Sequence, residues 1–247
     1  MYRQIADELR AAIRDGELAE GDMVPSESAL MAQHETSQGT VRKAMALLKA
    51  EGWVVPESGR GVFVRRRPVV FRKGNDRFAR ANRLGDNGRA AFDVEVGSHG
   101  LASRTETVVE GPTAPPDEAA ALLGLDDGDQ VAVRRRRMFA DGDIVQLADS
   151  YIPWDIAEGT QIVETDSGPG GIYARIEELG HELAEFDEQI RARPALPEEV
   201  EALGIESGMP VILLTRVAYD KEGRAVEVCD CVMTADRWCL DYRFPAT

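Results

Sequence analysis

The apolar positions at the start of the chain recur at the spacing of an amphipathic helix, and Gly16 ends this run. Two shorter helices are predicted next, because Ser26 and Ser37 stand where N-cap residues belong. Gly52 ends the last of the three predicted helices. The apolar positions are Tyr2, Ile5, Leu9 and Ile13 in the first helix and Val41, Ala44, Met45 and Leu48 in the third.

Two short apolar runs, residues 53–55 and 62–64, follow the third predicted helix. Between them, Gly59 and Gly61 permit the positive φ of a tight turn, so the two runs predict a β-hairpin. Two short helices followed by a hairpin have the layout of a winged helix-turn-helix, which places one helix in the major groove of DNA. We therefore expect residues 1–67 to form a DNA-binding domain.

An internal repeat organises the second half of the chain. Residues 116–142 and 197–223 share a Pro-acid-acid start, a Leu-Gly-apolar turn and an acid-Gly turn at an offset of 80 to 81 residues. Each copy predicts a short helix and a long hairpin, at about 130–152 and about 211–233. A helix over 172–179 and a strand over 183–191 are predicted between the copies.

Two copies of this unit predict one antiparallel sheet with pseudo-twofold symmetry, in an α+β domain over residues 100–247. Residues 68–99 have weak periodicity and several glycines, and we interpret them as a linker.

The charge of the chain separates along its length. The net charge is −15, but residues 1–67 hold 10 Lys and Arg against 10 Asp and Glu, so residues 68–247 carry the whole excess. The acidic part is therefore expected to stay away from DNA phosphates. In the first part Arg42, Lys43 and Arg60 follow the predicted turn, so a neutral domain can still present one basic face.

Composition restricts the remaining classes of protein. The chain has no run of 18 apolar residues and no signal-peptide core at its N-terminus, so no membrane span or membrane partner is expected. Its three cysteines, Cys229, Cys231 and Cys239, are an odd number and favour a reducing, cytoplasmic location. Cys229 and Cys231 share a strand face without a nearby histidine, so neither a metal nor a redox role is expected, and no cofactor loop is visible.

Several separated motifs of the first 64 residues agree with one family in register. They are Tyr2-Arg3-Gln4-Ile5-Ala6, Gly21-Asp22, Pro25-Ser26-Glu27, Thr40-Val41-Arg42, Leu47-Leu48 with Glu51-Gly52, and Gly59-Arg60-Gly61-x-Phe63-Val64. This set resembles the GntR family of bacterial transcription regulators. The resemblance implies that Gln38, Gly39 and Arg42 reach base edges, that Thr40 and the backbone near Ser26 hold phosphates, and that a wing-tip glycine enters the minor groove.

The candidate DNA contacts are Ser26, Ser37, Gln38, Gly39, Thr40, Arg42, Lys43, Gly59 and Arg60. The chain departs from the family at Ser28 and Gln38, where arginine is frequent. Because arginine pairs with guanine and glutamine with adenine, the operator sequence cannot be carried over from relatives.

A second set of motifs covers residues 100–244. It consists of Arg135-Arg136-Arg137, Asp141-Gly142, Ser150-Tyr151-Ile152-Pro153, Gly171-Ile172-Tyr173, Glu188, Ala225-Val226-Glu227 and Ala235-Asp236-Arg237. In this order they resemble the UTRA domain, the effector-sensing half of the HutC subfamily. That resemblance implies an antiparallel sheet similar to chorismate lyase, with a pocket between its two halves.

The chemistry of these residues suits a small anionic or polyhydroxylated metabolite. Arg135 and Arg137 alternate on a strand, so both can point into one cavity and bind a carboxylate or phosphate; in the alternative register Arg134 and Arg136 point inward. The candidate effector contacts are Arg135, Arg137, Tyr151, Gly170, Gly171, Tyr173, Glu188 and Glu227. The two glycines open a helix whose free N–H groups attract anions. The two glutamates either accept hydrogen bonds from the ligand or brace an arginine, and Tyr151 fits the core as well as the ligand site.

The sequence therefore predicts a ligand-responsive transcription factor that acts as a homodimeric repressor on a double-stranded operator. One alternative is a DNA-binding protein that needs no effector. The other is an enzyme of the lyase-like fold, but no nucleophile–base pair or metal cluster stands out in the sequence.

Overall fold

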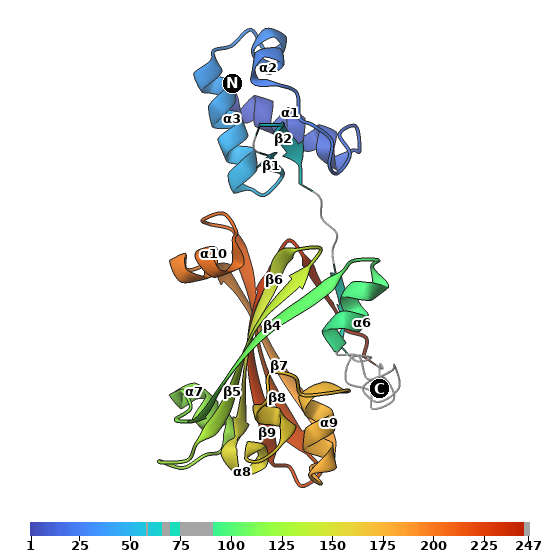
Figure 1. Ribbon diagram of the computed structural model, residues 1–247. Helices are drawn as coiled ribbons and strands as arrows, with labels where there is room; N and C mark the ends of the chain where they lie inside the picture. Colours follow the sequence, from blue (N-terminus) through green and yellow to red (C-terminus); the bar gives the residue numbers. More distant parts are fainter. Residues whose placement is uncertain (58, 66–69, 75–90, 245–247) are drawn as a thin grey trace. The chain divides into compact units, whose positions relative to one another are not determined.

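The computed structural model describes residues 1–57, 59–65, 70–74 and 91–244. The chain forms two compact units (Figure 1). The smaller one consists of Met1–Pro68, Pro194–Val200 and Ile205–Met209, and the larger one of Val69–Arg193, Glu201–Gly204 and Pro210–Thr247. Among the described residues, no helix combines the length and the apolar character that crossing a membrane requires.

The smaller unit has the predicted order of three helices and a hairpin. Its elements are α1 (Tyr2–Arg14), α2 (Glu27–Gln33), α3 (Gln38–Ala50), β1 (Val54–Glu57) and β2 (Gly61–Val64). The hairpin is antiparallel and pairs Val54 with Val64. Its core comes from every element, with Ile5 of α1, Leu30 of α2 and Leu48 of α3 in one buried cluster. The winged helix-turn-helix predicted from the apolar spacing is confirmed.

The larger unit is organised by one six-stranded sheet with the order β4-β5-β6-β9-β8-β7. Its strands are β4 (Ser103–Thr113), β5 (Val131–Ala140), β6 (Asp143–Pro153), β7 (Leu183–Pro194), β8 (Pro210–Asp220) and β9 (Ala225–Thr234). The order is symmetric about the β6–β9 pair, where Ser150 faces Cys229 and Ala148 faces Cys231. The predicted antiparallel sheet with two related halves is confirmed.

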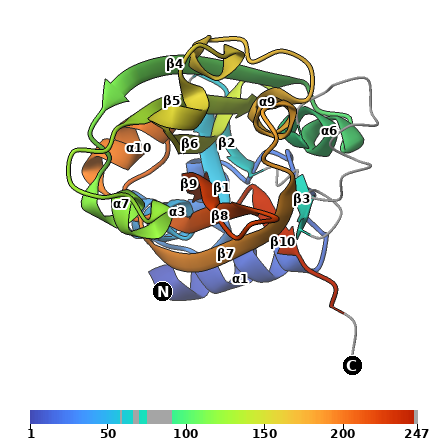
Figure 2. The ribbon, with the colours of Figure 1, turned by 90° about the horizontal axis from the view of Figure 1, so that it is seen from below.

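Helices cover both faces of this sheet. They are α7 (Asp117–Leu123), α8 (Trp154–Ala157) and α9 (Gly171–Glu178), with a short 3-10 helix, η1 (Gln161–Val163), while α10 (Pro197–Leu203) has residues in both compact units. On one face α7 packs over Val133 of β5 and Val228 of β9. On the opposite face, called the inner face below, α8, η1 and α9 pack over Ala132 of β5 and Ile152 of β6. Figure 2 shows α7 and α9 beside the sheet along a second direction.

The segment predicted as a linker contains two elements of the larger unit. Strand β3 (Val70–Lys73) pairs in parallel with β10 (Trp238–Asp241), and helix α6 (Ala91–Ser98) packs beside them. Phe92 and Val96 of α6 are buried in the same apolar cluster as Trp238. The sequence did not reveal β3 because it is four residues long and its partner lies more than 160 residues away. Residues 75–90 of the predicted linker lie outside the described residues.

Candidate functional site

The start of α3 presents the predicted base-reading side chains. Gln38 and Arg42 are both exposed, and both donate to the carboxylate of Glu27 on α2, at 2.9 Å from Gln38 Nε2 and 3.2 Å from Arg42 Nε. The hydrogen bond from Gln38, together with Arg42, lowers the pKa of Glu27. Glu27 therefore orients the two side chains, a role that its place in the Pro-Ser-Glu motif did not reveal.

The N-caps of α2 and α3 are the predicted serines. Ser26 Oγ accepts from the backbone N–H of Ala29, and Ser37 Oγ accepts from that of Thr40. Lys43 is exposed on α3, and a side-chain carbon added at Gly39 would meet no atom within 4 Å. The first turn of α3 is thus open to an approaching ligand.

The wing tip contains the remaining predicted contacts. Gly59 has a φ of 72° and Gly61 a φ of 129°, which side-chain-bearing residues rarely adopt. Arg60 forms an ion pair with Glu57, and its guanidinium lies 5.2 Å from the ring centroid of Phe63. The wing therefore holds one exposed cation at its tip.

Arginines of β5 occupy both faces of the sheet. The expectation that Arg135 and Arg137 point into one interior space is wrong, since their side chains are 47% and 53% exposed. Arg135 pairs with Asp149 and Glu110, and Arg137 pairs with Glu106. Arg134 is 4% exposed and Arg136 is partly buried, and both lie on the inner face. The sequence did not reveal which arginines point inward. Residues 131–133 are all buried although they alternate between the two faces of the sheet, so they show no alternation of apolar and polar positions.

Among the described residues, neither Arg134 nor Arg136 forms an ion pair with a carboxylate. Arg134 donates to three main-chain oxygens, those of Ile162 (2.6 Å), Glu164 and Thr165 (3.0 Å). Burial and the charge of Arg136 lower the pKa of Arg134 to about 10, which still leaves it protonated at neutral pH. Arg136 donates to Ser150 Oγ, while its buried Nε has no partner within the described part of the chain.

Glu227 is the central acceptor of the inner face. It is fully buried and accepts from Ser150 Oγ at 2.6 Å, from the hydroxyl of Tyr173, and from Arg216 Nη2 at 3.4 Å. Burial opposes the ionisation of Glu227, but the charges of Arg216 and Arg136 and these hydrogen bonds lower its pKa. Burial raises the pKa of Tyr173 well above its usual value, so this hydroxyl remains a donor.

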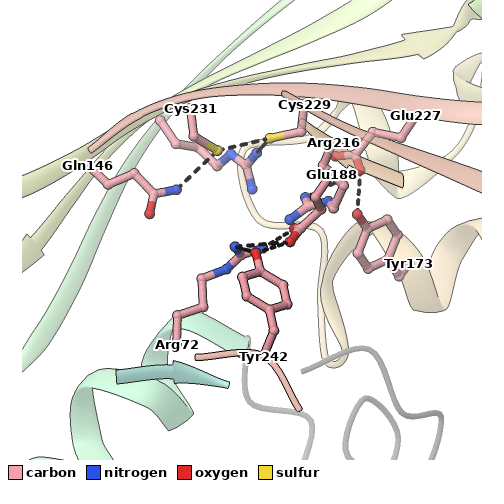
Figure 3. A network of polar contacts seen from close by, with 10 residues as sticks. Arg72, Gln146, Tyr173, Glu188, Arg216, Glu227, Cys229, Cys231 and Tyr242 are labelled. Atoms are coloured by element: carbon pink, nitrogen blue, oxygen red, sulfur yellow. Dashed lines mark hydrogen bonds and ion pairs between the residues drawn. The ribbon is translucent and has the colours of Figure 1, made fainter. Parts of the chain in front are cut away.

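A second carboxylate, Glu188 of β7, is held by Arg72 of β3 and by Tyr242. Arg72 Nη1 donates to Glu188 at 3.2 Å, and the Tyr242 hydroxyl donates at 2.6 Å (Figure 3). Burial alone would raise the pKa of Glu188, but the charge of Arg72 lowers it. Glu188 and Glu227 thus each brace an arginine, which was one of the two roles expected for them.

We call this group the interior polar cluster. It consists of Arg72, Arg134, Arg136, Ser150, Tyr173, Glu188, Arg216, Glu227 and Tyr242. Four arginines face two glutamates, so the cluster carries two positive charges in excess. The repeat offset of 80 residues places Arg136 and Arg216 in equivalent positions, and this was the signal in the sequence for their shared role.

Tyr151 does not join the cluster. It lies on the other face of the sheet, packed with Ala119 and Leu123 of α7, because its position on β6 alternates with that of Ser150. The expectation that it lines the same space as Tyr173 is therefore wrong, and its core role applies.

Gly170 and Gly171 begin α9 as expected. Both have positive φ, no side chain caps the helix, and a side-chain carbon at Gly171 would meet no atom within 4 Å. The preceding loop, residues 161–170, begins with η1. Arg134 donates to main-chain oxygens of this loop, and Arg175 donates to the side chain of Gln161 at 2.8 Å.

Comparison with known proteins identifies the two units. Residues 1–64 match the gntR family of bacterial regulatory proteins, and residues 98–238, more than half of the chain, match the UTRA domain. The chain belongs to the GntR family. Its combination of the two domains is the HutC-like architecture, and it is a ligand-responsive, DNA-binding transcriptional regulator and not an enzyme.

Similar proteins share this whole arrangement. An HTH-type regulator of Rhizobium meliloti is 30% identical over 96% of this chain and 92% of its own length. The HTH-type transcriptional repressor NagR of Bacillus subtilis is 27% identical over 96% of this chain and 92% of its own length. A solved GntR-family regulator is 27% identical, covers 100% of this chain and 98% of its own, and superposes with a TM-score of 0.64.

The buried ion pair of this GntR regulator predicts a pH-dependent stability. Glu227→Gln removes the buried carboxylate that pairs with Arg216, and losing one partner of such a pair costs about 3–5 kcal/mol. Because the folded pKa is depressed, the contribution is fully present above the pKa of an unfolded glutamate, about 4.3, and is lost as pH falls through the lower folded value. Urea denaturation should therefore show a larger difference from wild type at pH 7 than near pH 3.

The matched control is Glu106→Gln, which removes a carboxylate from exposed pairs with Arg104 and Arg137 on the other face. Exposed pairs are screened by solvent and contribute little to stability, so this variant should unfold close to wild type. Equal losses in the two variants would contradict the central role given to Glu227.

Proposed function

We propose that this regulator is a cytoplasmic, homodimeric repressor whose interior polar cluster binds a small anionic metabolite. Residues 1–67 form the DNA-binding domain and residues 100–247 form the effector-binding and dimerisation domain, while residues 68–99 connect them and contribute β3 and α6 to the larger fold. Effector binding releases the operator.

The excess charge of the interior polar cluster carries the proposal. Glu188 and Glu227 are occupied by arginine and tyrosine donors, so few acceptors are left for the hydroxyl groups of a neutral sugar. Neither Arg134 nor Arg136 forms an ion pair with a carboxylate of the described residues, and guanidinium groups prefer carboxylate or phosphate. These contacts favour an anion over an uncharged polyol.

The loop before α9 supplies a part that can respond to the anion. Arg134 holds this loop through the main-chain oxygens of Ile162, Glu164 and Thr165. An anion that pairs with Arg134 competes with these neutral acceptors, since a charge-assisted hydrogen bond is the stronger one. The loop then has two arrangements, and an effector with unequal affinity for them shifts their populations.

The effector test compares Arg136, which lies on the inner face, with Arg135, which lies on the exposed face of the same strand. A thermal-shift screen of metabolites bearing carboxylate or phosphate first identifies the effector. Arg136→Gln should then raise the effector concentration needed for half-release of operator DNA about tenfold or more, equivalent to about 1.4 kcal/mol or more. The control Arg135→Gln, on the exposed face, should respond like wild type.

An Arg136→Gln protein that releases DNA at the wild-type effector concentration would contradict the assignment of the cluster. So would an equal loss of response in Arg135→Gln, because that side chain is paired on the outer face.

The DNA-binding prediction concerns the first turns of α3. Arg42→Ala should weaken binding to the cognate operator by about 1–3 kcal/mol, because a base contact in the major groove is removed. Lys49→Ala, in the last turn of the same helix, should change the affinity little. Equal affinities of Arg42→Ala and wild type in a gel-shift titration would show that α3 does not read bases as proposed.

The homodimer is expected because one winged helix reads too few base pairs for a unique site, and two-fold pairing is the common solution. The edge strands β4 and β7 support it, since each exposes an apolar side chain, Val108 and Ile190 respectively. Light scattering at micromolar concentration should give twice the mass of the chain. A monomer both with and without operator would overturn this part of the proposal.

A further inference from the structure

Two cysteines of β9 lie side by side on the inner face of the sheet. Cys229 and Cys231 are 1% and 5% exposed, and their Sγ atoms are 3.6 Å apart. Figure 3 shows them next to the interior polar cluster. No contact assigned to effector or DNA above uses either sulfur.

The surroundings of the two sulfurs differ. Cys229 Sγ lies 3.4 Å from Arg136 Nη2 on the side of the cluster, and Cys231 Sγ lies 3.4 Å from Gln146 Nε2. A hydrogen bond from Cys231, with the charges of Arg216 and Arg136, lowers the pKa of Cys229 to about 6. The same shared hydrogen bond raises the pKa of Cys231 well above its usual value. Cys229, which lies against Arg136, is therefore the more acidic of the two thiols.

The backbone of β9 allows the two sulfurs to be linked. Residues i and i+2 of a strand point to the same face and have Cα atoms up to about 6.8 Å apart. This distance is the upper end of the range found across disulfides, about 4.4–6.8 Å. A bond between these positions can form but is strained, and strained disulfides are the ones that are readily reduced again.

We propose that Cys229 and Cys231 are a reversible oxidation site, at which a small hydroperoxide converts the two thiols to an intramolecular disulfide. The inference stands apart from the proposed effector site, because it concerns covalent chemistry of the free protein.

The reaction has two steps. The Cys229 thiolate attacks one oxygen of hydrogen peroxide, the O–O bond breaks, and the departing hydroxide takes a proton to become water, leaving a sulfenic acid on Cys229. The sulfur of Cys231 then attacks the Cys229 sulfur, so the S–S bond forms and the S–O bond breaks. The second hydroxide leaves with the thiol proton of Cys231 as water. In total, two electrons pass from the two thiols to the peroxide.

Burial restricts which oxidants can reach the pair. Both sulfurs are covered, but Arg136, which contacts Cys229, is only partly buried. A molecule near the size of water is therefore favoured over a bulky aromatic disulfide reagent.

The test treats the reduced, full-length protein with hydrogen peroxide and maps its cysteines by peptide mass spectrometry. The expected product is a peptide that has lost two hydrogens across Cys229 and Cys231, is restored by dithiothreitol, and leaves Cys239 unlinked. Cys239 is a fitting internal control because it lies apart from the pair on β10 and is less buried. A bulky aromatic disulfide should label Cys239 in the folded chain but spare the pair.

Two variants separate the roles of the sulfurs. In Cys231→Ser the sulfenic acid should accumulate on Cys229 and be trapped by dimedone, whereas Cys229→Ser should leave Cys231 unlabelled. The wild-type mapping needs no variant, so it decides the question even if a variant folds poorly. Oxidation confined to Cys239, or a pair that remains reduced after Cys239 has reacted, would overturn the proposal, as would dimedone trapping at Cys231 in Cys229→Ser.

Discussion

Buried arginine side chains on the inner face of the sheet are the constraint on which the larger unit depends. An arginine keeps its charge under all ordinary conditions, so each one taken out of water needs partners. Arg216 and Arg72 meet this need with Glu227 and Glu188. Within the described part of the chain, the hydrogen bonds of Arg134 go to main-chain oxygens. On the inner face, the arginines paired with glutamates already have a counter-charge, whereas the arginine bonded to neutral oxygens is suited to bind an anion.

This constraint also explains the ends of the larger unit. Arg72 belongs to β3, the first described strand after the DNA-binding unit, and it reaches Glu188 together with Tyr242 near the C-terminus. The short parallel pair of β3 and β10 is thus joined to the sheet by charge as well as by the apolar packing around Trp238. A ligand that changes the partners of Glu188 or Arg216 changes the environment of β3 directly.

Much of this architecture was predictable from local patterns. The three N-terminal helices, the wing, α7, α9, α10 and the two related hairpins follow from apolar spacing, glycine positions and an 80-residue repeat, whereas α6, α8 and η1 were not predicted. The orientation of the β5 arginines was not, because burial of both faces at residues 131–133 masks the two-residue period that would reveal it. The pairing of β3 with β10 and the approach of Arg136 to Cys229 were hidden as well, since both join segments distant in the sequence. Local spacing defines elements, but the contacts that give the inner face its chemistry are long-range.

The central claim is that one inner face senses an anion and that this sensing is coupled to DNA binding. Such coupling is reciprocal, because it is a free energy shared by two equilibria. The most direct test is calorimetric titration of the effector, once identified, into the protein alone and into its complex with operator DNA. The claim predicts that operator weakens effector binding by the same factor by which effector weakens operator binding. Equal effector affinities for free and DNA-bound protein would contradict it.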